Sequence, residues 1–325
     1  MKEKILITGG CGYIGSAVSS NFSRRYNVFV LDNLSNSSNK FLDKNIIFTK
    51  LDLSNYSLVK KFLTKHKFKK IIHLAAKKSV TDSEKKKKLY YKENFLNTVH
   101  LFNTASENGL NFFIFMSSAA VYGKCNSKIT INNRTIPLSF YGKTKLDAEK
   151  YLLKISKNSN IKIAILRLFN AAGADLVNKS GNQNKKELDL FSNIINSFEH
   201  KKVFKLFGNK FKTKDGTCLR NFIHINDISN IVGAVLKYLS TFKKNIVLIN
   251  VCSEKAYSIL QVIKYFEVFY KKKLSFEIKT KRLGEIARSD ADCSFIRKKL
   301  KYRCKFSNLD ILVKSSVLWS RFIKY

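Results

Sequence analysis

The chain has 325 residues, 45% of them hydrophobic, and 61 Lys and Arg residues stand against 23 Asp and Glu. Length and composition predict a globular protein with a full core and two domains, and they exclude intrinsic disorder. The start lacks the apolar run of a signal peptide, and no stretch approaches the roughly 18 uncharged apolar residues of a membrane span. We therefore expect a cytoplasmic protein without membrane contact.

The net charge of +38 has two interpretations, a nucleic-acid or anionic-membrane surface and a diffuse surface bias. Lysine clusters occur at residues 85–88 and 271–273, but lysine is frequent everywhere and no nucleic-acid module is recognisable. We favour the bias and expect no specific nucleic-acid partner. The six cysteines are scattered without a Cys-x-x-Cys pair, so we expect no metal, no disulfide framework and mostly buried, reduced thiols.

Hydrophobic periodicity predicts alternating strands and helices in the first half. The predicted strands are 4–8, 27–31, 46–48, 71–75, 111–117 and 161–168. The predicted helices are 13–24, 56–66, 84–107 and 140–156, and the third has a poorly defined basic start. This alternation predicts an α/β fold with a doubly wound parallel sheet of the Rossmann type.

The pattern changes after about residue 170. Residues 175–187 are polar and predict a loop, and mixed short elements follow. Residues 245–251 look like one more buried strand, so the C-terminal half is expected to return to the first sheet. We predict a cofactor domain over 1–170 and a smaller, substrate-binding domain over most of 171–325.

A glycine loop, Thr8-Gly9-Gly10-Cys11-Gly12-Tyr13-Ile14-Gly15, joins the first strand to the first helix. Gly9, Gly12 and Gly15 would let the backbone turn tightly and approach a pyrophosphate at the helix N-terminus. Asp32 ends the second strand, where a carboxylate binds ribose hydroxyls and repels a 2′-phosphate. The pair predicts NAD rather than NADP as the cofactor; the alternative for Asp32 is an ordinary strand-end turn.

Tyr141 and Lys145 lie four residues apart on one predicted helix, and Ser118 follows a predicted strand. A nearby ammonium and a positive nicotinamide ring both favour the phenolate, so we expect Tyr141 to act as a base near pH 7. Ser118 would hydrogen-bond the reacting hydroxyl. A Tyr-x-x-x-Lys pair is common on protein surfaces, and the glycine loop before it is what favours catalysis.

The order of these motifs, together with Gly216–His224, resembles the UDP-galactose 4-epimerases of the extended short-chain dehydrogenase/reductase family over nearly all of the chain. The resemblance implies further cofactor contacts from Tyr13, Ile14, Asn33, Asp52, Leu53, Lys78 and Asn94, the last of which could instead bond within the core. It implies substrate contacts from Ser118, Tyr141, Asn170, Arg220, Arg282, Glu285 and Ser289. It also implies a homodimer formed through the helices 84–107 and 140–156.

The resemblance predicts NAD-dependent 4-epimerisation of a UDP-hexose through a transient 4-keto sugar. A small Ser289 at the sugar 2-substituent would admit N-acetylated sugars, and Ala119 and Ala120 argue against a dehydratase. The alternatives are an enzyme acting on UDP-glucuronate or a dTDP-sugar and a basic binding protein without catalysis. The chain departs from the family pattern at Asn221-Phe222, Glu187–Leu190 and Lys85–Lys88; these departures spare the cofactor and catalytic residues and affect the expected sugar-nucleotide affinity and the choice of substrate.

Overall fold

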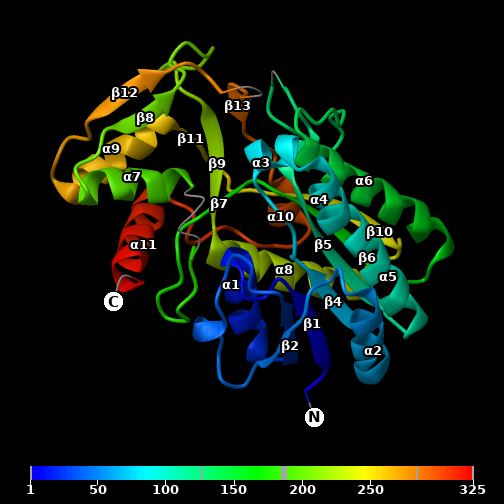
Figure 1. The fold of residues 1–325 in the computed structure, drawn as a ribbon. Helices are drawn as coiled ribbons and strands as arrows, with labels where there is room; N and C mark the ends of the chain where they lie inside the picture. The colour runs from blue at the N-terminus through cyan, green and yellow to red at the C-terminus, as the bar shows by residue number, and fades with distance from the viewer. Residues whose placement is uncertain (1, 126, 184–188, 283–284, 324–325) are drawn as a thin grey trace.

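A seven-stranded parallel sheet forms the centre of the computed structural model, which describes residues 2–125, 127–183, 189–282 and 285–323 (Figure 1). The strand order is β10-β6-β5-β4-β1-β2-β3. Their bounds are β1 Lys4–Thr8, β2 Asn27–Asp32, β3 Ile47–Lys50, β4 Lys70–His73, β5 Phe112–Ser118, β6 Lys162–Leu168 and β10 Ile246–Val251. The order changes direction between β1 and β4, which places a crevice at the carboxyl ends of these strands.

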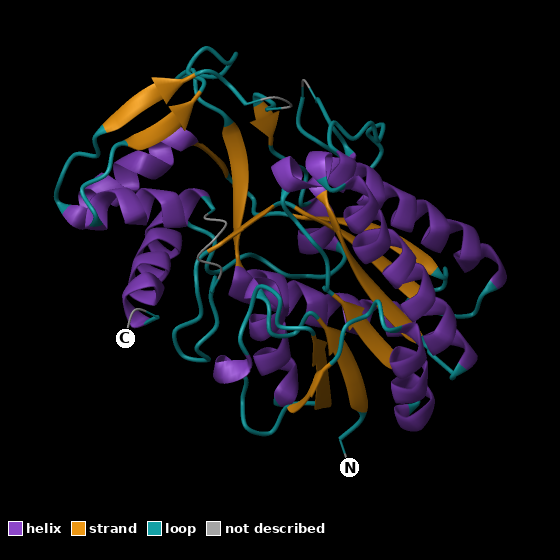
Figure 2. Ribbon diagram, in the orientation of Figure 1, coloured by secondary structure: helices purple, strands orange, loops and turns teal. Residues whose placement is uncertain are grey.

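Helices cover both faces of this sheet (Figure 2). On one face α1 (Tyr13–Ser23), α8 (Ile225–Thr241) and α10 (Ser294–Lys298) share a buried core with the sheet. On the other face the same is true of α2 (Tyr56–His66), α5 (Asn97–Glu107) and α6 (Phe140–Ile155). The strands are apolar on both faces because both are covered, as expected for a parallel sheet.

The remaining elements build a smaller unit with its own core. Its helices are α7 (Leu190–Glu199), α9 (Ile259–Tyr270) and α11 (Leu309–Phe322). Its strands are β7 (Asn170–Ala172), β8 (Phe204–Phe207), β9 (Leu219–His224), β11 (Ala256–Ser258), β12 (Phe276–Lys279) and β13 (Arg288–Ser289). Strand β9 pairs with β7, β11 and β13, and β8 pairs with β12.

One expected helix, 84–107, proves to be several pieces. The chain runs through α3 (Val80–Lys85), α4 (Lys87–Tyr91), a π-helical turn η2 (Lys92–Leu96) and α5. The break at Lys86 lies in the lysine run, where four like charges disfavour one continuous helix. Three short 3₁₀ turns complete the secondary structure: η1 (Asn39–Phe41), η3 (Ala119–Val121) and η4 (Ser156–Asn158).

The other predicted strands and helices of the first half agree with the structure to within one residue at each end, except that β3 runs two residues further and β4 ends two residues earlier than predicted. Strand β10 does return to the first sheet, where it pairs with β6 from Ile246 opposite Ile163 to Val251 opposite Leu168. The division at residue 170 stays a prediction. Residues 184–187 of the expected loop lie outside the described ranges. Among the described helices, none is long and apolar enough to cross a membrane.

Candidate active site

The glycine loop between β1 and α1 leaves no room for side chains at two positions. Gly9 has φ +69°, and a Cβ there would lie 2.6 Å from the Ala75 backbone nitrogen. A Cβ on Gly15 would lie 2.0 Å from the Gly9 carbonyl oxygen. Gly12 is the N-cap of α1 and, in this described part of the chain, no side chain caps the helix. The first-turn N–H groups therefore face the loop, where they can bind an anion.

Asp32 fixes this loop to the end of β2. The Oδ2 atom of its buried carboxylate accepts the backbone N–H of Cys11 at 3.0 Å, and Oδ1 accepts that of Leu34 at 2.9 Å. Next to it, the Asn33 amide donates to Asp52 Oδ2 at 2.7 Å. The pKa of Asp52 is lowered overall, because hydrogen bonds from Asn33 and Ser54 outweigh burial, which acts in the opposite direction. Asp52 thus stays ionised and orders the segment beside the loop.

Asn94 bonds within the core, the second of its two predicted roles. The fully buried amide accepts the Lys77 N–H at 2.9 Å, donates to the Lys77 carbonyl at 3.0 Å and donates to Thr144 Oγ1 at 3.2 Å. It therefore ties the loop after β4 to α6. Lys78, on that same loop, is exposed and lines the cleft.

Ser118, Tyr141 and Lys145 come together at the end of β5 and the start of α6. Ser139 caps α6 by accepting the Gly142 N–H at 3.1 Å, which places Tyr141 in the first turn. Ser118 hydrogen-bonds the Tyr141 side chain. Lys145 is buried, and its Nζ donates to the Met116 carbonyl at 2.9 Å. All three residues line one cleft with the glycine loop.

The two titratable groups differ from the sequence expectation. Burial lowers the pKa of Lys145 to about 7, although Glu149 opposes this. Burial raises the pKa of Tyr141, and the Ser118 hydrogen bond only partly opposes it. The expected lowering of the Tyr141 pKa by Lys145 is therefore wrong for the protein alone. The reason is that Lys145 bonds Met116 and is only partly charged near pH 7, so burial decides the direction of the Tyr141 shift.

A buried ion pair behind this group escaped sequence analysis. Glu149, one turn after Lys145, is paired with Arg167 of β6 at 2.7 Å and accepts the Ser117 hydroxyl at 2.5 Å. The i, i+4 spacing from Lys145 was the available signal for Glu149. Nothing in the sequence indicated Arg167 as its partner.

The predicted substrate residues divide into two groups. Asn170 lines the cleft, and its amide donates to the Asn221 carbonyl at 2.9 Å. Ser118 and Tyr141 line it as well, whereas Arg220, Arg282, Glu285 and Ser289 gather around β9 and β13, outside the residues that line the cleft. Arg220 Nη2 lies 3.9 Å from Glu285 Oε1, Ser289 is opposite Arg220 in the β13–β9 pair, and the Arg282 guanidinium lies 3.9 Å from the Phe207 ring centre.

The loop before α7 adds cleft residues that were not among the predicted site residues. Gln183 accepts the Ser38 N–H at 2.9 Å and donates to the Cys11 carbonyl at 3.5 Å, so it holds the loop over the glycine turn. Asp189 caps α7 and lines the cleft with Leu190. Glu187 and Leu188, the other half of the departure noted in the sequence, lie outside the described residues.

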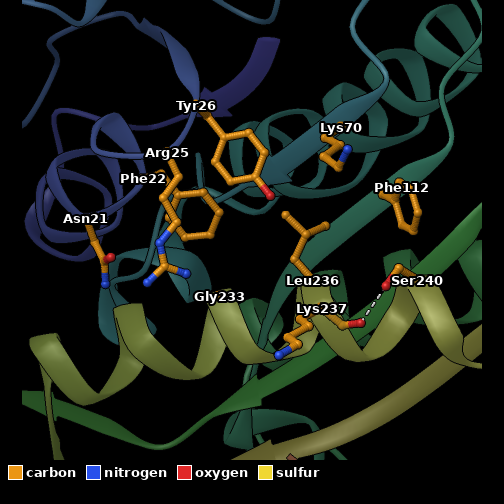
Figure 3. Close-up of a pocket in the computed structure, with 10 residues that line it drawn as sticks. All are labelled: Asn21, Phe22, Arg25, Tyr26, Lys70, Phe112, Gly233, Leu236, Lys237 and Ser240. Atoms are coloured by element: carbon orange, nitrogen blue, oxygen red, sulfur yellow. Dashed lines mark hydrogen bonds between the residues drawn. The ribbon is translucent and has the colours of Figure 1, made fainter. Parts of the chain in front are cut away.

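The cleft has a volume of about 730 Å³ and is lined by the following predicted residues: Gly9, Gly12, Tyr13, Ile14, Gly15, Asp32, Asn33, Leu53, Lys78, Ser118, Tyr141, Lys145 and Asn170. A smaller hollow of about 350 Å³ lies between α1, α8 and the starts of β4 and β5 (Figure 3). One of its two lysines, Lys70, is already paired with Glu3 and lies over the Phe112 ring. None of the residues predicted from the sequence lies there, so the chemistry belongs to the larger cleft.

Comparisons with known proteins agree with this geometry. The sequence matches the model of the NAD dependent epimerase/dehydratase family over residues 5–252. The UDP-glucose 4-epimerase of Lactobacillus helveticus is 30% identical over 322 residues, which cover 98% of this chain and 97% of that protein.

Two solved structures are similar over almost the whole chain. The Bifidobacterium longum UDP-glucose 4-epimerase in complex with NAD+ and UDP has a TM-score of 0.91 at 27% identity, covering 98% of each chain. The Campylobacter jejuni UDP-Glc/GlcNAc 4-epimerase has a TM-score of 0.85 at 33% identity, covering 98% of this chain and 99% of that one. The chain therefore belongs to the NAD dependent epimerase/dehydratase family, and the relatives it resembles here are UDP-glucose 4-epimerases.

Proposed function

We propose that the protein catalyses NAD-dependent 4-epimerisation of a UDP-hexose, such as UDP-glucose and UDP-galactose. The observation that carries this proposal is the convergence of Ser118, Tyr141 and Lys145 in one cleft with the glycine loop and Asp32. That cleft combines a base for a sugar hydroxyl with a site for a hydride carrier, which is what reversible oxidation at C4 requires.

The residues present fit NAD. A loop with no space for a Cβ at Gly9 and Gly15, opening an uncapped helix, is suited to a pyrophosphate. The Asp32 carboxylate at the strand end suits ribose hydroxyls and opposes a 2′-phosphate. Tyr13, Ile14, Asn33, Asp52, Leu53 and Lys78 would flank the bound dinucleotide. When bound, NAD supplies the acceptor and later the donor of a hydride.

Tyr141 would move the proton in both halves of the reaction. Its phenolate would take the proton of the sugar 4-hydroxyl, while Ser118 would orient that hydroxyl through a hydrogen bond. Lys145 would bond the nicotinamide ribose, and the positive charge of the bound cofactor would favour the phenolate. The 4-keto sugar would rotate about its pyrophosphate link so that its other face is presented. Tyr141 would then return the proton to the 4-oxygen of the opposite epimer.

The cluster around β9 would hold the sugar nucleotide. The guanidinium groups of Arg220 and Arg282 suit a pyrophosphate, and the Glu285 carboxylate suits a ribose. Asn170 at the cleft would bond a diphosphate or sugar oxygen, and Ser289 would face the sugar 2-substituent. Arg220 Nη2 lies 3.9 Å from the Glu285 carboxylate, and we expect substrate binding to draw the two apart.

We also propose a homodimer in the cytoplasm. The helices α5 and α6 contact each other, and Figure 1 shows α4, α5 and α6 along one side of the molecule. Leu89 and Leu96 on this side are 38% and 39% exposed. The net charge of +38 opposes association at low salt. Sedimentation of a monomer at physiological salt and micromolar concentration would contradict the dimer. The six free cysteines fit a reducing compartment.

The deciding experiment gives the purified protein UDP-glucose, UDP-N-acetylglucosamine and UDP-glucuronate separately and counts the 4-epimers. We expect interconversion of UDP-glucose and UDP-galactose. Turnover of UDP-glucuronate alone would instead favour the alternative of an enzyme that acts on UDP-glucuronate. Tyr141→Phe should keep the fold and bound NAD but lose about 2–4 orders of magnitude in kcat, the scale of a general acid–base group. Wild-type turnover in that variant would refute the assignment.

The remaining alternative is a basic binding protein that keeps the fold but has no catalytic activity, and the relatives described above do not favour it. Salt-sensitive nucleic-acid binding stronger than UDP-sugar binding, without epimer formation, would support it.

A further inference from the structure

Three of the six cysteines gather where β10 ends and the chain leaves β13. Cys252 follows β10 and is fully buried, and its thiol lies 3.7 Å from the Ala291 carbonyl oxygen. Cys293 lies two residues after Ala291, and its side chain packs against the buried cluster that contains Cys252, where the two thiols interact through a hydrogen bond. The third, Cys304, has its sulfur 4.0 Å from the Cys252 carbonyl oxygen. None of these thiols belongs to the cofactor or sugar machinery proposed above.

The two hydrogen-bonded thiols have different environments. Cys293 is partly exposed, and its pKa is lowered to about 7, chiefly by the hydrogen bond from Cys252. Lys128 also lowers it, while burial, Glu254 and Asp292 raise it. That same hydrogen bond and burial raise the pKa of Cys252. A partly exposed thiolate beside a buried, protonated thiol is the arrangement of an attacking and a resolving cysteine.

We propose that Cys293 and Cys252 form a thiol pair that hydrogen peroxide converts reversibly into a disulfide. The Cys293 thiolate attacks one peroxide oxygen, the O–O bond breaks, and a sulfenic acid and hydroxide result. The Cys252 sulfur then attacks the sulfenic sulfur, and the hydroxyl group leaves as water with the Cys252 proton. Two thiols lose two electrons and two protons in total, and one peroxide becomes two waters. A dithiol reductant reverses the bond by exchange.

Hydrogen bonds hold the backbone just before Cys293 in place. Ala291 N–H donates to the Asn221 side chain at 2.7 Å, and Asp292 N–H donates to the Ile129 carbonyl at 2.8 Å. Sulfurs that already share a hydrogen bond need only a short approach to reach an S–S length of about 2.05 Å. The bond would tie the segment after Ser289 to the end of a central strand.

Peptide mapping tests the proposal without reference to epimerase activity. The reduced full-length protein is treated with a small excess of hydrogen peroxide, alkylated, and digested with trypsin without reduction. Cleavage after Lys244, Lys255, Arg288 and Arg297 gives the peptides 245–255 and 289–297, which carry one cysteine each. We expect these peptides linked and about 2 Da lighter than their sum, and separated again by dithiothreitol.

Single variants separate the two roles. Cys252→Ser should leave a sulfenic acid on Cys293 that dimedone labels, and Cys293→Ser should abolish the link. Cys304→Ser, a neighbour without a role here, should form the link as the wild type does. Cys125 is an internal control, because burial raises the pKa of its thiol and it should stay reduced. A link from Cys293 to Cys304, or Cys293 no more reactive than Cys125, would overturn the proposal.

Discussion

Replacing Glu149 by Gln would remove one charge from a pair that lies wholly inside the protein. Glu149 is 0% exposed and Arg167 is 4% exposed. The Glu149 carboxylate accepts Arg167 Nε at 3.1 Å and Nη2 at 2.7 Å, and it also accepts the Ser117 hydroxyl. Gln keeps the shape and one acceptor oxygen, but it leaves the guanidinium charge without a counter-charge in the interior.

Breaking a buried pair from one side costs about 3–5 kcal/mol, because the remaining charge stays desolvated. That is a large share of the about 5–15 kcal/mol by which native proteins are stable. The same helix offers a matched control: Asp147 pairs with Lys143 at 2.8 Å, but Lys143 is 55% exposed. Asp147→Asn should therefore cost only about 0.3–0.5 kcal/mol.

Urea unfolding followed by far-ultraviolet circular dichroism, with NAD equally saturating in every sample, measures both costs. The double variant Glu149→Gln, Arg167→Met should recover most of the loss, because it removes the unpaired charge. The argument fails if Glu149→Gln loses no more stability than Asp147→Asn, or if the double variant is no better than the single one.

Three further predictions concern the cleft and the core. Asp32→Ala should weaken NAD binding and narrow the preference over NADP in a binding titration; a wild-type preference for NADP would show the assignment to be wrong. Ser289→Tyr should lower kcat/KM for UDP-N-acetylglucosamine about 10–200-fold relative to UDP-glucose. A variant that uses the acetylated sugar as well as the wild type does would show that Ser289 does not face the sugar 2-substituent. His73 is buried, and burial lowers its pKa from 6.5 to about 3, so the unfolded chain binds a proton that the folded chain does not. The stability that neutral His73 allows is fully present above pH 6.5 and is lost as the pH falls toward 3. The melting temperature should therefore fall less steeply between these pH values in His73→Gln than in the wild type. The same pH dependence of the melting temperature in both proteins would contradict this role of His73.

The elements of the cofactor half could be predicted because local pattern and tertiary environment agree there. The strand at Lys4–Thr8 and the helix at Tyr56–His66 begin and end where their periodicity indicates. The prediction of one continuous helix over 84–107 was wrong because the conformation of this segment depends on a contact with residues distant in the sequence. The π-helical turn contains Asn94, whose amide holds Lys77 and Thr144, and periodicity carries no information about that contact.

The grouping of three proposed catalytic residues could be predicted from the sequence, but their electrostatics could not. Motif spacing brought Ser118, Tyr141 and Lys145 together correctly, since one strand end and one helix turn determine their positions. The direction of the Tyr141 pKa shift depends on burial and on where the Lys145 ammonium points, neither of which spacing encodes. Arg220 and Glu285 are paired with each other, which the resemblance to substrate-binding residues did not suggest.

The position of β10 has a consequence for synthesis of the chain. Strand β6 ends at Leu168, but its outer neighbour begins only at Ile246, about 80 residues later. At roughly 5–20 residues per second, a ribosome needs about 4–16 s to make that interval. During that time the apolar edge of β6, with Ile163 and Ile165, stays open to pairing with other chains. We therefore expect a chain truncated before residue 246 to aggregate, even though it holds the glycine loop and the proposed catalytic residues.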